Sequence, residues 1–107
     1  MATLDAEVAR RAVAAAKALG RQGVVRAAYV FGSHVDGRPN RWSDIDLAAF
    51  MDGLGSWDIW RRTRAIVKVQ KEVGFDVEPH LFPASALHDA EAGSFAADVL
   101  RRGVRIL

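Results

Sequence analysis

The sequence predicts an α/β (α+β) fold in which helices pack on a small mixed β-sheet. Short apolar runs typical of buried strands alternate along the chain with longer amphipathic segments typical of helices. Glycine or proline stands at most of the boundaries between these segments. The chain has 107 residues, of which 50% are hydrophobic and 26% charged, and this size suits one domain with a buried core. We therefore expect residues 1–107 to form a single domain.

The first part of the chain should form a helix followed by a strand. Apolar residues recur on one side of residues 4–19, acidic residues come early and Lys17 comes late, as the helix dipole favours. Gly20 is the expected end of this helix. Residues 24–31 are an apolar run between two glycines, which predicts a buried strand.

A loop, a second strand and a second helix should follow. Residues 34–43 contain glycine, proline and asparagine and predict a loop, with a short helical turn directly after Ser33. Residues 44–50 predict the second strand, which a glycine-rich turn ends. Ser56 can cap the next helix, and Gly74 closes it.

The last part of the chain should add a third strand and a C-terminal helix. Residues 75–82 alternate between apolar and polar side chains, which predicts a strand with an acidic polar face. A weak helical turn is expected at residues 84–89 and a capped helix at residues 94–102. The final residues 104–107 are suited to pairing at a sheet edge.

The composition excludes several kinds of site and partner. The chain has no cysteine, which excludes disulfides, thiolate catalysis and cysteine-ligated metals. The net charge is only +2 and the basic residues come as scattered pairs, so nucleic acid is not an expected partner. No apolar run reaches the length of a signal peptide or a membrane span, so we expect a cytoplasmic protein without a membrane partner. The composition is compatible with a homo-oligomer.

Two carboxylates separated by one apolar residue mark the second strand. In a strand, Asp44 and Asp46 project from one face while Ile45 and Leu47 point to the other. Crowded carboxylates oppose folding unless a cation compensates their charge. Mg²⁺ is a hard ion that takes oxygen ligands, and a pair of such ions can clamp an in-line phosphoryl displacement. The pattern predicts that Asp44 and Asp46 hold two Mg²⁺ ions.

A third carboxylate is expected on the neighbouring strand. Asp76 is the first assignment, as a metal ligand and as the general base for an acceptor hydroxyl. Glu78, two residues further on and on the same face, takes its place if the register differs. His80 continues this polar face and either lines the site or flanks it.

The Gly32-Ser33 turn after the first strand is suited to binding phosphate. Glycine lets the backbone approach a phosphate without a Cβ in the way, and the following N–H groups bind anions if they open a helical turn. The Ser33 hydroxyl would contact the β- or γ-phosphate of a nucleoside triphosphate. A Gly-Ser turn or an Asp-x-Asp pair alone is a weak signal. Both together, each at the end of an apolar strand, predict a nucleotide site.

These residues match the pattern of a known family. The segment 31–47, with Gly32-Ser33 ten residues before Asp44-Ile45-Asp46, resembles the G-S-x10-D-x-D signature of the DNA polymerase β-like nucleotidyltransferases. The size of the chain and its ending, from Phe95 through Gly103-Val104-Arg105-Ile106-Leu107, look like the stand-alone minimal nucleotidyltransferases (the MNT group). The resemblance implies the nucleotidyltransferase fold, and the order of the expected elements agrees with it over nearly the whole chain.

The resemblance also implies an activity and a partner. Asp44, Asp46 and Asp76 would bind two Mg²⁺ ions, and Gly32 and Ser33 would contact the triphosphate. The implied reaction transfers a nucleoside monophosphate, AMP from ATP, to an acceptor hydroxyl and releases pyrophosphate. Many minimal members act as antitoxins beside a HEPN-domain toxin, and some adenylylate that toxin on tyrosine. A HEPN-domain protein is therefore the partner expected here.

One departure from the family pattern keeps other functions open. Many members carry basic residues shortly after the Gly-Ser pair, where this chain has His34 and Asp36. Asp36 places negative charge where the triphosphate would lie, and Arg38 and Arg41 are the candidates to compensate it. The alternative function is a binding module of the same fold that neutralises its partner by occlusion, without turnover. Transfer to a small hydroxyl compound such as an aminoglycoside ranks last, because the chain lacks the length for the extra domain that usually helps form such a pocket.

Overall fold

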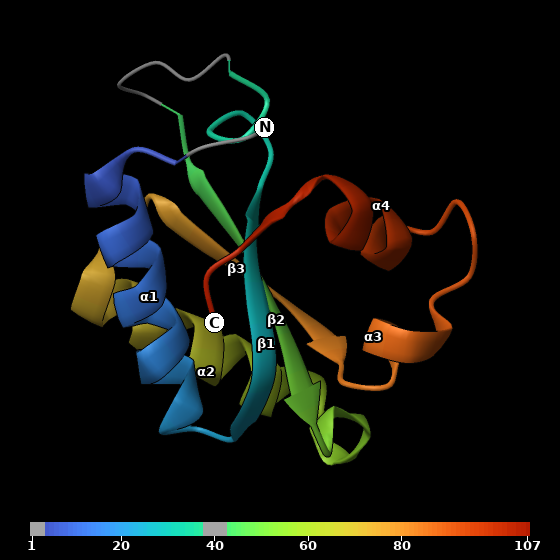
Figure 1. The fold of residues 1–107 in the computed structure, drawn as a ribbon. Coiled ribbons are helices and arrows are strands. Elements are labelled where there is room, and N and C mark those ends of the chain that lie inside the picture. The colour runs from blue at the N-terminus through green and yellow to red at the C-terminus, as the bar shows by residue number, and fades with distance from the viewer. Residues whose placement is uncertain (1–3, 38–42) are drawn as a thin grey trace.

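The strands form one mixed sheet in the computed structural model, which describes residues 4–37 and 43–107 (Figure 1). The strands in chain order are β1 (Val24–Phe31), β2 (Ile45–Asp52), β3 (Val77–Pro83) and β4 (Val104–Arg105). Their order in the sheet is β3-β2-β1-β4, with β1 antiparallel to both of its neighbours and β2 parallel to β3. A parallel pair needs a crossover connection, and the helix α2 (Ile59–Val73) supplies it.

Helices cover both faces of this sheet, as Figure 1 shows. The helix α1 (Ala6–Gly20) packs with α2 on one face. The short helix α3 (Ala86–Asp89) and the helix α4 (Phe95–Arg102) lie on the other face. A 3-10 turn, η1 (Leu54–Ser56), follows β2. Within residues 4–37 and 43–107, each helix is too short or too polar to cross a lipid bilayer.

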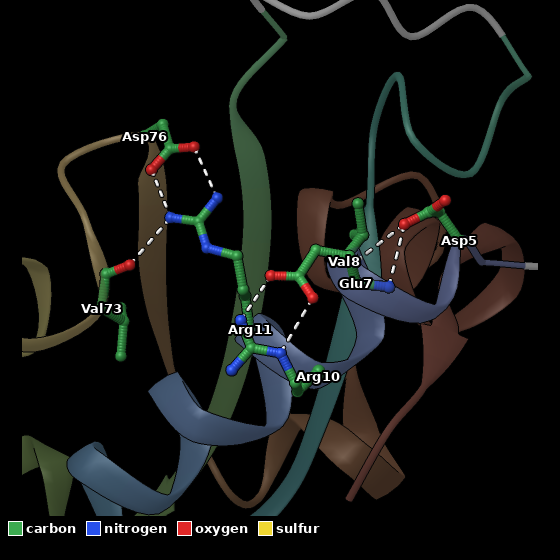
Figure 2. A network of polar contacts seen from close by, with 7 residues as sticks. All are labelled: Asp5, Glu7, Val8, Arg10, Arg11, Val73 and Asp76. Carbon is green, nitrogen blue, oxygen red and sulfur yellow. Dashed lines mark hydrogen bonds and ion pairs between the residues drawn. The ribbon is translucent and has the colours of Figure 1, made fainter.

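The larger core lies between the sheet and the two helices α1 and α2. The side chains that α1 buries are mostly alanines, which lets the helix axis approach the strands closely. The Asp5 carboxylate accepts hydrogen bonds from the backbone N–H groups of Glu7 and Val8 and so fixes the start of α1 (Figure 2). The strand residues of this core are Ala28, Val30, Ile45, Leu47, Ala49, Met51 and Val77.

The smaller core lies under α3 and α4. Phe50 is fully buried there, stacks on Phe82 with ring centroids 5.2 Å apart and meets the edge of Tyr29 at 5.8 Å. Val99 of α4 and Ala48 of β2 complete this core. Successive residues of β2 therefore divide between the two cores, and the even-numbered residues face α4.

The predicted fold class is confirmed, since helices pack on a small mixed sheet. The predicted order of helices and strands along the chain is also found. The first strand has the expected bounds, and Gly74 follows α2 as predicted. The C-terminal segment pairs beside β1 at the edge of the sheet, where Ile106 N–H donates to the carbonyl of Ala28 at 2.9 Å.

Several element boundaries differ from the expected ones. The second strand spans Ile45–Asp52 and not residues 44–50, so Asp44 lies just before it. The second helix is capped by Asp58, whose carboxylate accepts from Arg61 N–H at 2.8 Å. Ser56 is not the cap, because it lies in η1 and its hydroxyl donates to the carbonyl of Gly53 at 2.9 Å. The third strand begins at Val77 and not at residue 75, because Phe75 and Asp76 belong to the turn that precedes it.

Candidate active site

Three polar side chains meet where β2 and β3 run side by side. The parallel register places Asp46 opposite Glu78 and Ala48 opposite His80. Side chains two residues apart on a strand share one face, so Glu78 and His80 join Asp46 on the face that carries α4. One ligand atom from each of Asp46, Glu78 and His80 lies within 4.8 Å of the other two. Within the described part of the chain, no other group of three acidic or histidine side chains is arranged closely enough to hold a metal ion.

Negative charge is concentrated at this point. Some loss of hydration beside the sheet, the charge of Asp46 and a hydrogen bond shared with Asp46 raise the pKa of the Glu78 carboxyl, although the residue is exposed. The charge of Asp44 acts on Glu78 in the same direction, while His80 opposes the shift. Asp44 is exposed and lies directly before β2. These carboxylates therefore repel one another, and a bound cation would relieve the repulsion.

Gly32 brings the turn after β1 directly against Asp46. Its φ is +83°, and a Cβ placed there would lie 2.6 Å from the Asp46 carboxylate oxygen Oδ2. The chain then turns back on itself, because Val35 and Asp36 both donate their N–H groups to the Gly32 carbonyl, at 3.0 and 2.9 Å. The backbone from Ser33 onward thus forms a hydrogen-bonded turn beside the carboxylates. Only a residue without a side chain allows this approach.

Asp76 lies apart from this group. Its carboxylate oxygens accept hydrogen bonds from Arg11 of α1 at 2.5 and 2.7 Å, and Arg11 Nη2 also donates to the Val73 carbonyl at 2.8 Å (Figure 2). The hydrogen bond with Arg11 holds the pKa of Asp76 below its ordinary value. Asp76 precedes the first residue of β3, so the alternation of a strand does not fix its direction. The structure therefore brings Glu78, and not Asp76, to Asp46.

The contact between Arg11 and Asp76 is expected to stabilise the fold. The two side chains are 24% and 50% exposed, and they join α1 to the start of β3. In a double-mutant cycle with Arg11→Met and Asp76→Asn, urea unfolding should give a coupling energy of about 0.5–1 kcal/mol. The matched control is the pair of Arg10 and Glu7 on the same helix, whose side chains are 67% and 62% exposed. Equal coupling in both pairs would contradict the structural role given to Arg11.

Aromatic rings hold His80 in place. The His80 ring lies edge-on to Phe31 and to Phe95, with ring centroids 5.1 and 5.8 Å away. A groove of about 320 Å³ adjoins the group and is lined by the first turns of α2, by β3 and by Phe95, with His80 at the boundary between groove and acidic group. Phe31 precedes the Gly-Ser turn in the sequence, a position that could have marked it as part of the site. No local pattern marks Phe95, because only the packing of α4 brings it there.

The loop after Gly32 is partly described. Asp36 Oδ1 lies 3.6 Å from Arg102 Nη2 of α4. The guanidinium of Arg102 therefore partly compensates the charge of Asp36, the residue at which the chain departs from the family pattern. His34 Nε2 donates to the Ser43 carbonyl across the loop at 3.2 Å. Arg38 and Arg41, the expected compensating residues, lie outside the described residues.

Comparison with known proteins identifies the family of the chain and agrees with its fold. The family described as "Polymerase beta, Nucleotidyltransferase" matches residues 15–107. A crystal structure from Sulfolobus solfataricus, named a "putative nucleotidyltransferase", shares the fold with a TM-score of 0.56 and 17% sequence identity, over 92% of this chain and 82% of that one. None of the curated proteins compared with the chain matches it. The chain belongs to the polymerase β nucleotidyltransferase family, and its class of activity is nucleotidyl transfer.

Proposed function

We propose that this chain transfers AMP from ATP to a hydroxyl group of a partner protein and releases pyrophosphate. The observation that carries the proposal is the meeting of Asp46 and Glu78 beside the Gly32 turn. The acceptor oxygen forms a bond to the α-phosphorus, and the bond from that phosphorus to the oxygen bridging to the β-phosphate breaks. Pyrophosphate leaves with the electron pair, and the hydroxyl proton passes to a carboxylate.

The donor set fits divalent ions of the Mg²⁺ type. Asp46 and Glu78 offer carboxylate oxygens within 4.8 Å of each other, and Asp44 adds a further charge nearby. Bound ions would neutralise phosphate charge and lower the pKa of the acceptor hydroxyl. Of the chain's own residues, Asp44, Asp46 and Glu78 would hold two Mg²⁺ ions. Glu78 takes the role that the sequence first assigned to Asp76, including that of candidate general base.

The Gly32-Ser33 turn supplies the other half of the proposed site. Gly32 lets the backbone lie against the Asp46 carboxylate, and a triphosphate would approach this turn without a Cβ in the way. The Ser33 hydroxyl and the backbone N–H groups of the turn would bind the triphosphate and orient its α-phosphorus toward the carboxylates. The contact of Asp36 with Arg102 reduces the repulsion that Asp36 would otherwise exert on the nucleotide.

We further propose a HEPN-domain protein as the partner and acceptor, with this chain as its antitoxin. The support is the resemblance to the minimal nucleotidyltransferases, together with apolar side chains exposed near the groove. Ile59 and Trp60 at the start of α2 are 68% and 69% exposed, and Ile59 also lines the groove beside His80. A protein docked there would place its acceptor residue close to the acidic group.

The test follows the two ends of the triphosphate separately. The chain and a HEPN-domain protein encoded beside it are incubated with Mg²⁺ and with ATP labelled at either the α- or the γ-phosphate. The α-label should become attached to the partner, while the γ-label appears only in pyrophosphate, and a chelator should stop both. Asp46→Asn should be inactive and Asp52→Asn, at the far end of the same strand, should be active. A tight complex with no α-label on the partner from any nucleotide would instead support the occluding module.

A further inference from the structure

We infer that His80 is a nitrogen ligand of one divalent ion in the acidic group, so that this ion site prefers Mn²⁺ to Mg²⁺. The inference rests on the proposed function, because it takes Asp46 and Glu78 as ligands of the same ion. It concerns a residue to which neither the signature motif nor the third-carboxylate assignment gives a role. The argument uses the position of the ring, a distance and the chemistry of imidazole.

The strand register places His80 toward the ion site. Glu78 and His80 are two residues apart on β3 and share the face of the sheet that carries Asp46. Phe31 and Phe95 lie against the imidazole ring and restrict its rotation. Of the other two histidines, His34 is bonded to the Ser43 carbonyl and His88 is exposed on α3. Neither joins the group of Asp46, Glu78 and His80.

The distance between His80 and Asp46 suits shared ligation. His80 Nε2 lies 3.4 Å from Asp46 Oδ1, which is longer than the usual range of about 2.7–3.2 Å for an N–H···O hydrogen bond. Two ligands that each lie about 2.1–2.2 Å from one ion, at roughly a right angle, are about 3 Å apart. A small movement of either side chain therefore completes a shared ion site. A hydrogen bond by which His80 only orients Asp46 fits this distance as well, and the variants of His80 below separate that role from ligation.

Imidazole changes which ion the site selects. Mg²⁺ takes oxygen ligands and keeps several of its waters, so it gains little from a nitrogen donor. Affinity for nitrogen-containing sites generally rises along the first-row divalent ions, beginning with Mn²⁺. A site of two carboxylates and one imidazole should therefore bind Mn²⁺ more tightly than a site with carboxylates alone. The imidazole should add much less to the affinity for Mg²⁺.

The test measures Mn²⁺ binding to the whole chain without nucleotide, so that adenine nitrogens cannot contribute. Free Mn²⁺ is titrated by electron paramagnetic resonance, and pulsed measurements detect ¹⁴N coupled to the bound ion. Wild type should show imidazole ¹⁴N coupling. His80→Phe, which keeps a ring among the aromatic side chains, should lose the coupling and bind Mn²⁺ at least about tenfold more weakly. The affinity for Mg²⁺, measured by competition, should change far less.

Two further variants separate ligation from other roles. His88→Gln should behave as wild type, because His88 lies outside the group. His80→Gln keeps a hydrogen-bond donor but has no imidazole, and it should bind Mn²⁺ as weakly as His80→Phe. Wild-type Mn²⁺ affinity in His80→Gln, or the absence of ¹⁴N coupling in wild type, would overturn the inference. Nitrogen-ligated Mn²⁺ in a chain that transfers no nucleotide would overturn the proposed function and leave this inference standing.

Discussion

Glu78→Gln is expected to lower the rate of nucleotidyl transfer at least about a hundredfold, while Asp76→Asn leaves it nearly unchanged. A metal-binding carboxylate contributes several kcal/mol of charge stabilisation, and about 1.4 kcal/mol corresponds to a factor of ten in rate. Glu78 lies opposite Asp46 in the register of β2 and β3, whereas the Asp76 carboxylate is bound by Arg11. The measurement is the single-turnover rate of α-label transfer at saturating Mg²⁺.

The two variants are matched controls for each other. Each replaces a carboxylate by its amide, and the two positions are two residues apart in the chain. Asp76→Asn should lower the stability to urea by loosening the contact with Arg11, and Glu78→Gln should not lower it. If Asp76→Asn abolishes transfer at a temperature where it is fully folded, Asp76 is the third ligand and the assignment of Glu78 is wrong.

Gly32→Ala should produce the second large effect, again about a hundredfold loss of transfer. The added Cβ would lie 2.6 Å from Asp46 Oδ2, so the carboxylate or the turn must move. The left-handed φ of +83° adds about 1–2 kcal/mol of backbone strain for a residue with a side chain. Transfer rate and urea stability are measured on the same preparation, since the first reports the displaced carboxylate and the second the strain.

Gly37→Ala separates these two contributions. Gly37 lies in the same loop with a φ of +78°, but a Cβ at that position would have no atom of residues 4–37 or 43–107 within 4 Å. The variant should therefore show a similar loss of stability and keep its transfer rate. Equal losses of rate in the two variants would mean that backbone strain, and not the contact with Asp46, accounts for the effect at Gly32.

The fold was largely predictable because its signals are local. Apolar runs bounded by glycine predicted the first two strands, and the apolar side of residues 4–19 predicted the first helix. The start of α2 was predicted wrongly because two neighbouring residues compete to cap this helix. Ser56 and Asp58 are both good helix caps, and the hydrogen bond of Ser56 to Gly53 leaves that role to Asp58.

The candidate site was predictable only in part. Gly32 and Asp46 were placed together by the spacing of the signature, and the structure brings them into contact. The choice between Asp76 and Glu78 depended on the residue at which β3 begins. β3 begins directly after Asp76, and Asp76 is bonded to Arg11, which is 65 positions away in the sequence. No local sequence pattern reveals a contact over that separation. The placement of Phe95 against His80 is equally non-local.

Gly74 shows how the anchoring of β3 limits change in this chain. Its φ is +122°, and a Cβ there would lie 2.4 Å from Arg11 Nη2 and 2.7 Å from Asp76 Oδ1. The Asp76 carboxylate is thereby held in the contact with Arg11, and Glu78 is the acid that lies opposite Asp46. A replacement at position 76 therefore also changes the surroundings of Arg11 and Gly74, so the three positions are coupled in the architecture of this turn.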